Sequence, residues 1–320
     1  MNSRKFLIMA ALAVGVLPVA LTSCDRGDKG GNGNEGPANG EGTELRLSTG
    51  VETPSRAAFT AADTQIPGGE NVAVWVDETG GAVQLYGNNV LTADGIGDLD
   101  GGVRMFFPEN GMSTDIYAIH TDAALGVAYP AAALTHTVRA DQRALADYAA
   151  SDLLYARTTN VAKTSSAIGM TFFHLLTKIQ VAVKPGNGLT ASDILGITIG
   201  GTKPDAVFTL DKSTAPAAIG VTAGGSVSDI TTGVDVSDDF SAPRYNDAII
   251  VPQSVAGNTP FITVHLAGGD LTYRLPSTID FASGKKYIYQ VTANLSWIIL
   301  KSSIEDWTPI NPVAGNAIME

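Results

Sequence analysis

The sequence predicts an all-β protein with room for two domains. Thr, Val and Ile are frequent, Gly is abundant at 35 residues, and charged residues make up only 16%. Short runs that alternate apolar and polar residues recur along the chain, separated by Gly, Asn, Asp and Pro, as expected for strands joined by tight turns. A chain of 320 residues is long enough for two domains, each with its own core.

The first 24 residues have the organisation of a bacterial lipoprotein signal. Two basic residues precede an apolar run at 6–21, which ends in Leu-Thr-Ser-Cys at 21–24, and Cys24 is the only cysteine. This order defines a secretory signal, and an apolar run of this length, interrupted by Pro18, is short for a transmembrane span. We predict that residues 1–23 are removed and that lipidated Cys24 anchors the chain to the outer membrane at the cell surface.

Residues 24–43 are predicted to be a flexible tether. After Cys24 they contain no aliphatic side chain larger than alanine, so they cannot bury enough apolar area to offset the entropy of ordering. The formal net charge of −12 disfavours nucleic acids and anionic membrane surfaces as partners. With the one thiol lipidated, neither a disulfide nor a cysteine-based zinc site is available.

The remaining chain divides into two blocks of predicted strands. The first block has strands at 44–51, 71–76, 82–86, 103–107, 115–120 and 151–156, with residues 134–150 as the candidate helix. The second has strands at 171–183, 194–200, 206–210, 248–251, 261–266, 271–275, 286–300 and 303–307. The polar stretch 157–167 is the predicted boundary. We therefore expect domains at 44–165 and 166–320, each a Greek-key β-sandwich.

Catalytic motifs are missing from the sequence. It contains no G-x-S-x-G, H-E-x-x-H or P-loop motif, and its histidines, His120, His136, His174 and His265, are far apart. The acidic loop 94–102 fails the calcium-loop pattern, because it places Gly102 and Val103 where that pattern requires an oxygen ligand and a glycine. We expect no enzymatic activity, no cofactor and no metal site.

The order of several motifs resembles the fimbrillin family, the type V pilins of Gram-negative gut and oral anaerobes. The resemblance lies in the lipobox and tether, the strand 44–51 followed by Ser-Arg-Ala at 55–57, Val-Ala-Val-Trp-Val at 72–76, Asp-Leu-Leu-Tyr-Ala at 152–156, Phe-His-Leu-Leu-Thr-Lys-Ile-Gln-Val at 173–181 and Ile-Glu-Asp-Trp at 304–307. It implies two transthyretin-like β-sandwich domains in tandem, secretion as a lipoprotein and assembly into a fibre.

The resemblance also implies donor-strand exchange triggered by a protease. In such pilins an arginine-specific surface protease removes the first strand, and the open groove accepts a strand from a neighbouring subunit. Here the removable segment is 44–56, and the face that fills the groove consists of Leu45, Leu47, Thr49 and Val51. Arg56, in a turn after the strand, is the predicted cleavage site. Arg46 is the less favoured site, because pairing within the strand protects it. In the alternative interpretation, Arg56 is a solvated turn residue and the strand stays in place.

The sequence does not identify the donor strand. After Trp307 only a short tail remains, in which residues 313–319 follow two prolines and are long enough for one short strand. The second half of the run 287–300 is the other candidate, provided that it is unpaired within its own domain. The position of the subunit in a fibre, as shaft, tip or anchor, therefore stays open.

Two functions remain. The first is a structural subunit of a cell-surface fimbria that contributes to adhesion. Its partners would be other pilin subunits, the outer-membrane lipid and an arginine-specific protease, with no nucleic acid. The second is a surface-anchored lipoprotein that binds a glycan or host ligand, as a tip adhesin or anchor subunit. The aromatic residues available for stacking on sugars are Trp75, Tyr86, Trp297 and Trp307, although aromatic residues on strands more often belong to a core.

Overall fold

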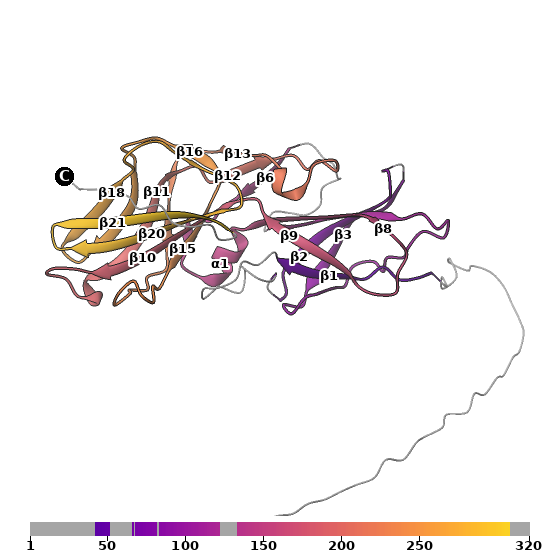
Figure 1. Ribbon diagram of the computed structural model, residues 1–320, viewed down its shortest axis with the longest axis horizontal. Coiled ribbons are helices and arrows are strands. Elements are labelled where there is room, and N and C mark those ends of the chain that lie inside the picture. Colours follow the sequence, from indigo (N-terminus) through magenta and orange to yellow (C-terminus); the bar gives the residue numbers. More distant parts are fainter. Residues whose placement is uncertain (1–41, 52–65, 67, 82, 122–132, 308–320) are drawn as a thin grey trace, which may run out of the picture. The chain divides into compact units, whose positions relative to one another are not determined.

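The computed structural model describes residues 42–51, 66, 68–81, 83–121 and 133–307 (Figure 1). Strands make up 56% and helices 5% of it, which confirms the all-β prediction. The described residues, from Gly42 to Trp307, belong to one compact unit.

Seven strands form a closed barrel. Its strand order is β1-β4-β3-β2-β5-β8-β9. The strands are β1 (Leu47–Val51), β2 (Asn71–Glu78), β3 (Gln84–Ala93), β4 (Asp98–Asp100), β5 (Thr114–Thr121), β8 (Leu153–Val161) and β9 (Ile168–His174). Closure gives every one of these strands a neighbour on both sides, so the barrel has no open edge.

The other described strands form four further sheets. Their orders are β15-β10-β20-β21, β18-β17-β11-β14-β7, β13-β12-β6 and β16-β19. The strands are β6 (Leu134–Thr137), β7 (Asp141–Gln142), β10 (Thr177–Pro185), β11 (Ile194–Thr202), β12 (Asp205–Phe208), β13 (Val221–Gly224), β14 (Ser228–Thr232), β15 (Asn246–Ile250), β16 (Gln253–Val255), β17 (Pro260–Leu266), β18 (Gly269–Arg274), β19 (Ile279–Phe281), β20 (Lys285–Asn294) and β21 (Trp297–Asp306). The helix α1 (Leu145–Ala150) and the 3₁₀ turns η2 (Ala191–Asp193) and η3 (Pro216–Ala218) lie between them.

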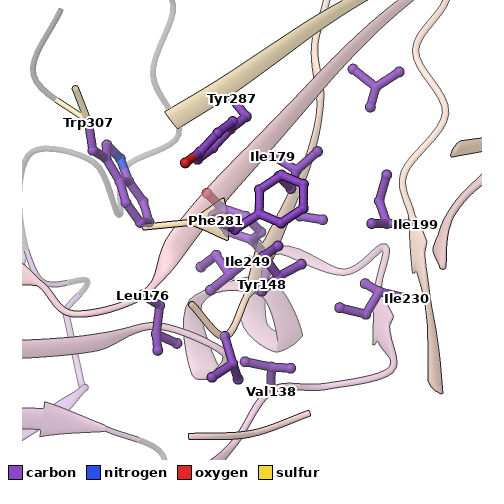
Figure 2. Packing of buried hydrophobic residues seen from close by; sticks show 14 of the residues in the cluster. Val138, Tyr148, Leu176, Ile179, Ile199, Ile230, Ile249, Phe281, Tyr287 and Trp307 are labelled. Atoms are coloured by element: carbon purple, nitrogen blue, oxygen red, sulfur yellow. The ribbon is translucent and has the colours of Figure 1, made fainter. Parts of the chain in front are cut away.

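Strand β2 serves two cores, because side chains alternate across a strand. Val72, Val74 and Val76 belong to the barrel core. Ala73 and Trp75 point the other way and join the large core formed by the later sheets. Figure 2 shows part of this second core, where side chains from α1, β10, β11, β15 and β20 meet. All six of the strand's central residues are therefore buried, which explains why its sequence is almost uniformly apolar.

Strand pairing crosses the predicted boundary at 165/166 in both directions. Strand β9 follows the boundary but pairs with β8 and β1 of the barrel. Strands β6 and β7 precede the boundary but pair with β12 and β14. The division into domains 44–165 and 166–320 stays a prediction.

Three predicted elements differ in the structure. The candidate helix 134–150 is helical only at 145–150, because residues 134–137 and 141–142 pair with later strands. Residues 103–107 form no strand and contribute one bridge, from Phe106 to Glu44. The run 286–300 turns back at Leu295–Ser296, and β21 pairs with β20 along all ten of its residues. The second half of this run is therefore paired within the subunit, so the condition for its use as a donor strand is not met.

A buried aromatic and ionic cluster ties the last described residue to the end of the barrel. The His174 ring stacks on the Trp307 indole with 3.8 Å between ring centroids and an interplanar angle of 10°. The Nδ1 atom of His174 lies 2.8 Å from Oδ2 of Asp152, and both side chains are buried. Burial by itself raises the pKa of the Asp152 carboxyl and is the largest single effect, but the adjacent His174 ring, the Leu153 amide and His120 together outweigh it and hold that pKa below its usual value. The carboxylate form is thus stabilised by folding.

Asp152→Asn should make the free energy of unfolding less sensitive to acid. Because the pKa of Asp152 is lower in the folded protein, its carboxylate contributes stability above the unfolded-state pKa of about 3.9, and this contribution is lost as the pH falls through the folded-state pKa. Urea unfolding at about pH 5 and about pH 3 should show a smaller loss for the variant than for the wild type. The exposed Asp100, replaced by Asn, is the matched control. An unchanged pH dependence in D152N would contradict the assignment.

Candidate functional site

The first strand closes the barrel between two strands that are distant in the sequence. Strand β1 runs parallel to β9 over five residue pairs, from Leu47 opposite Ile168 to Val51 opposite Phe172. It runs antiparallel to β4 over two pairs. Without β1, the facing sides of β4 and β9 would both become open edges.

Backbone hydrogen bonds extend this pairing upstream of β1. The Leu45 amide donates to the carbonyl of Met105 at 2.8 Å, and the Phe107 amide donates to the carbonyl of Thr43 at 3.0 Å. Within β1, the Thr49 amide donates to the Gly97 carbonyl at 2.6 Å. Residues 43–51 therefore form one continuous paired segment, longer than the strand itself.

The inward side chains of this segment fill the barrel core. Leu45 and Leu47 are only 2% and 3% exposed, and they pack in the cluster that contains Leu99, Ile168 and Met170. Thr49 is half-buried. The backbone of Val51 belongs to β1, and its side chain lies outside the described residues. Each buried leucine stabilises the fold by about 1.5–3 kcal/mol relative to an exposed one.

The two candidate cleavage sites differ in what the structure describes. The exposed Arg46 is held through both its backbone and its side chain. Its carbonyl accepts from the Ile168 amide at 2.8 Å, and its Nη2 donates to the Ser165 carbonyl at 2.5 Å. Arg56 and Cys24 lie outside the described residues. Arg56 belongs to the connection between Val51 and Ile66, and Ile66 is buried in the barrel core. A cut at Arg56 would thus separate β1 from the rest of the barrel. The barrel would keep Ile66, the first core residue that follows Arg56 in the described sequence.

The acidic loop 94–102 supports the edge of this segment. One oxygen of Asp94 accepts hydrogen bonds from the amides of Ile96, Gly97 and Asp98 at 2.8–3.0 Å. These bonds, with that from Ile96 the largest effect, hold the pKa of the Asp94 carboxyl below its usual value. The ordered loop presents the Gly97 carbonyl to Thr49. Gly97 has a φ of 128°, a conformation that side chains disfavour. The sequence shows the Asp-Gly turn but not this contact with β1.

The segment also carries an exposed ion pair. Glu44 Oε1 lies 2.9 Å from Nε of Arg104, and this hydrogen bond holds the pKa of Glu44 below its usual value. Both groups face solvent, so the pair contributes little to stability.

Each of the four histidines has its own polar partner. His120 contacts the Asn71 carbonyl, His136 lies between Thr121 and the Ser151 carbonyl, and His265 lies between Thr198 and Asp270. His174 pairs with Asp152. Within the described residues, no three His, Cys, Asp or Glu side chains gather as a metal site would require.

The four aromatic residues considered for sugar stacking differ in exposure. Trp75 and Trp307 are buried in the large core, and the Tyr86 hydroxyl accepts a hydrogen bond from the Phe106 amide. Trp297, on β21, is 45% exposed. Among the parts of the chain that are described, no helix has the length and apolar character needed to cross a membrane.

Comparison with known proteins decides the family. Residues 55–307, most of the chain, match the family model described as fimbrillin-like. The chain belongs to the fimbrillin-like family. A protein of Bacteroides uniformis, provisionally described as fimbrium subunit Fim1C, is 28% identical over 160 residues, which cover 47% of this chain and 48% of that relative. The match thus spans about half the length of the relative.

Solved structures of other proteins share this fimbrillin-like fold. A Bacteroides uniformis protein and a Bacteroides ovatus protein, both provisionally described as cell adhesion proteins, give TM-scores of 0.61 and 0.62 at 19% and 17% identity. The alignments cover 85% and 84% of this chain and 100% and 99% of the two relatives. The tip fimbrial protein Mfa3 of Porphyromonas gingivalis gives 0.50 at 10% identity, covering 83% of this chain and 99% of its own. At these identities the likeness concerns the fold.

Leu47→Ala should destabilise the barrel by about 2–5 kcal/mol, because it leaves a cavity in a packed core. Urea unfolding of the full chain measures the difference in the free energy of unfolding. Arg46→Ala, which changes the exposed neighbour on the same segment, should cost far less, close to the range of about 0.5 kcal/mol for surface positions. Equal losses for the two variants would show that the segment does not seal the barrel core.

Proposed function

We propose that this protein is a structural subunit of a cell-surface fimbria and assembles by donor-strand exchange in its barrel. The observation that carries the proposal is the position of β1. It is the first strand of the described residues, it closes the barrel, and its neighbours β4 and β9 are otherwise unpaired on that side. Membership of the fimbrillin-like family and the fimbrium-subunit description of a relative support it.

The geometry explains why a replacement strand would bind. Loss of β1 would expose the core cluster lined by Leu99, Ile168 and Met170 and leave unpaired backbone groups on β4 and β9. An incoming extended segment satisfies both, with main-chain hydrogen bonds providing affinity and alternate side chains filling the pockets of Leu45 and Leu47. The exposed core and the unpaired backbone groups would also make an opened subunit prone to pair with any suitable strand.

In this proposal the subunit reaches the outer membrane as a lipoprotein through Cys24. An arginine-specific surface protease then cuts after Arg56 and removes lipid, tether and first strand together. Arg46 is the less favoured site, because its backbone and side chain are both hydrogen bonded. The partners are other pilin subunits, and the product contributes to adhesion.

Binding of a glycan or host ligand is the second candidate. The exposed Trp297 is its support in the structure, because the other three aromatics pack in cores or hold a backbone amide. A tip or anchor subunit could combine such binding with the same barrel.

Limited digestion with an arginine-specific protease should cut first at Arg56 and should yield subunits that form ladders of oligomers. The product should begin at Ala57, because the paired backbone at Arg46 resists cleavage. Native gels, protein mass spectrometry and electron microscopy measure the result. Arg56→Ala should keep its first strand and stay monomeric, even if the protease trims the predicted tether at Arg26, whereas Arg46→Ala should behave as the wild type. Uncut protein that polymerises equally well would rule out strand removal as the trigger.

A synthetic peptide of residues 43–51 should block the ladders formed by cut subunits. The peptide restores the hydrogen bonds and the two leucines that the barrel loses, so it competes with a donated strand for the groove. The same peptide with Asp in place of Leu45 and Leu47 is the matched control and should have little effect, because burying unpaired carboxylates is costly. Equal inhibition by both peptides would argue against the groove as the assembly site.

A further inference from the structure

A row of four charged side chains crosses the sheet β15-β10-β20-β21. Asp247 lies on β15, Lys178 on β10, Lys286 on β20 and Glu305 on β21. Lys178 lies opposite Lys286 in the parallel pair, and Lys286 lies opposite Glu305 in the antiparallel pair. The row contains two ion pairs, with Nζ–O distances of 2.9 Å for Lys178 and Asp247 and 3.3 Å for Lys286 and Glu305.

The pair of Lys178 and Asp247 is the drier and more fully enclosed of the two. Their side chains are 1% and 13% exposed. The rings of Tyr148 and Trp307 flank the amine, with centroids 5.6 Å and 6.0 Å from Nζ. The amine contacts Oδ2 of the carboxylate, while Nε2 of Gln180 donates to Oδ1 at 3.1 Å. The Lys178 amine, a potential nucleophile, thus contacts one oxygen of the Asp247 carboxyl group, and the Gln180 amide donates a hydrogen bond to the other.

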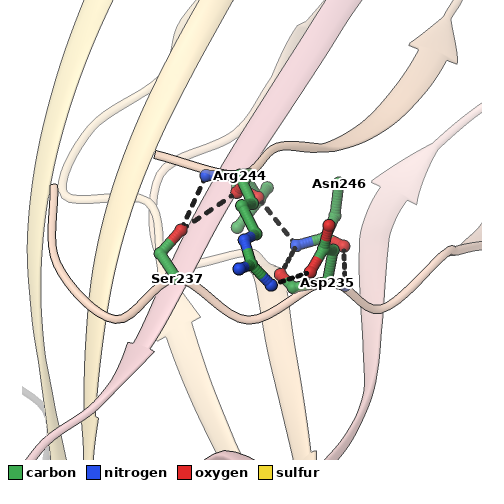
Figure 3. Close-up of polar contacts among 5 residues, drawn as sticks. Asp235, Ser237, Arg244 and Asn246 are labelled. Atoms are coloured by element: carbon green, nitrogen blue, oxygen red, sulfur yellow. Dashed lines mark hydrogen bonds and ion pairs between the residues drawn. The ribbon is translucent and has the colours of Figure 1, made fainter. Parts of the chain in front are cut away.

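The backbone around Asp247 holds this geometry in place. Asn246 donates from Nδ2 to the carbonyls of Val181 and Asp235 at 3.0 Å and 2.9 Å, which fixes the start of β15 against β10 (Figure 3). At the other end of β15, the Gln142 side chain exchanges two hydrogen bonds with the backbone of Ile249, at 2.9 Å and 2.8 Å. The amine and the carboxyl therefore cannot drift apart without breaking buried hydrogen bonds.

We propose that Lys178 and Asp247 condense to an intramolecular isopeptide bond. One proton passes from the ammonium to the carboxylate, and the lone pair of the neutral amine then attacks Cγ. Oδ1 carries the charge of the tetrahedral intermediate and is stabilised by the Gln180 amide. Oδ2 leaves as water with a second proton from Nζ. The balance is one ammonium and one carboxylate giving one secondary amide and one water, so no oxidant or other reactant is needed.

Two physical effects favour this reaction in the folded protein. Holding the reacting groups together gives effective concentrations of about 10⁵–10⁸ M in well-oriented cases. The product is neutral, so it removes two charges whose burial is costly. The bond would join the outer strand β15 to β10 and would resist peeling of the sheet in a fibre under tension. A chain with a single cysteine has no disulfide within itself to do this.

Mass spectrometry of the full chain tests the proposal. The chain carries Cys24→Ser to prevent lipidation. Its intact mass should be lower than the sequence mass by one water. A tryptic map should contain a branched peptide that joins Lys178 to Asp247, with no cleavage after Lys178. Two unlinked peptides would overturn the proposal. So would loss of water located at Asp94-Gly95 or Asp100-Gly101, where succinimide formation gives the same mass change.

Two variants complete the test. Lys178→Arg keeps a cation beside Asp247 but cannot form the amide, so it should show the full sequence mass and no branched peptide. Lys286→Arg changes the neighbouring pair in the same row and should keep the branched peptide. A branched peptide that persists in K178R would overturn the assignment. The map of the wild-type chain decides the question by itself if K178R does not fold.

Discussion

The barrel depends on one pairing, that of β1 with β9. These strands are separated by most of the barrel sequence, yet they run parallel over five residue pairs and complete the ring. The two leucines of the segment seal the core from the same side. Barrel closure, core burial and protection of two strand edges are thus concentrated in the first described residues of the chain.

This concentration links fold to proposed function. The closing strand is the one element that a single chain cut after β1 would remove without disturbing the order of the others. In the proposed account, the lipid on Cys24 determines the route to the surface and the cut at Arg56 determines the timing. Release from the membrane and opening of the groove would then be one event. The later sheets, held by a large core and the cluster of Asp152, His174 and Trp307, would stay folded.

The sequence predicted local features well and long-range pairing poorly. Alternation around Leu45 and Leu47 indicated a half-buried strand, and both side chains are buried. Nothing local indicated that this strand would pair in parallel with residues 168–172, because such a pairing depends on the whole chain. Likewise, the Ala and Arg content of residues 134–150 suggested a helix, but its first part, which contains the poor helix formers Thr, His and Val, pairs with β12 and β14. The turn at Leu295–Ser296 was missed because it has neither Gly nor Pro.

N-terminal analysis of the subunit in fibres taken from the cell surface tests the central claim most directly. If β1 is removed before the groove is filled, the fibre subunit begins at Ala57 and residues up to Arg56 are absent. A fibre subunit that still carries residues 44–51, or that remains blocked at a lipidated Cys24, would contradict it.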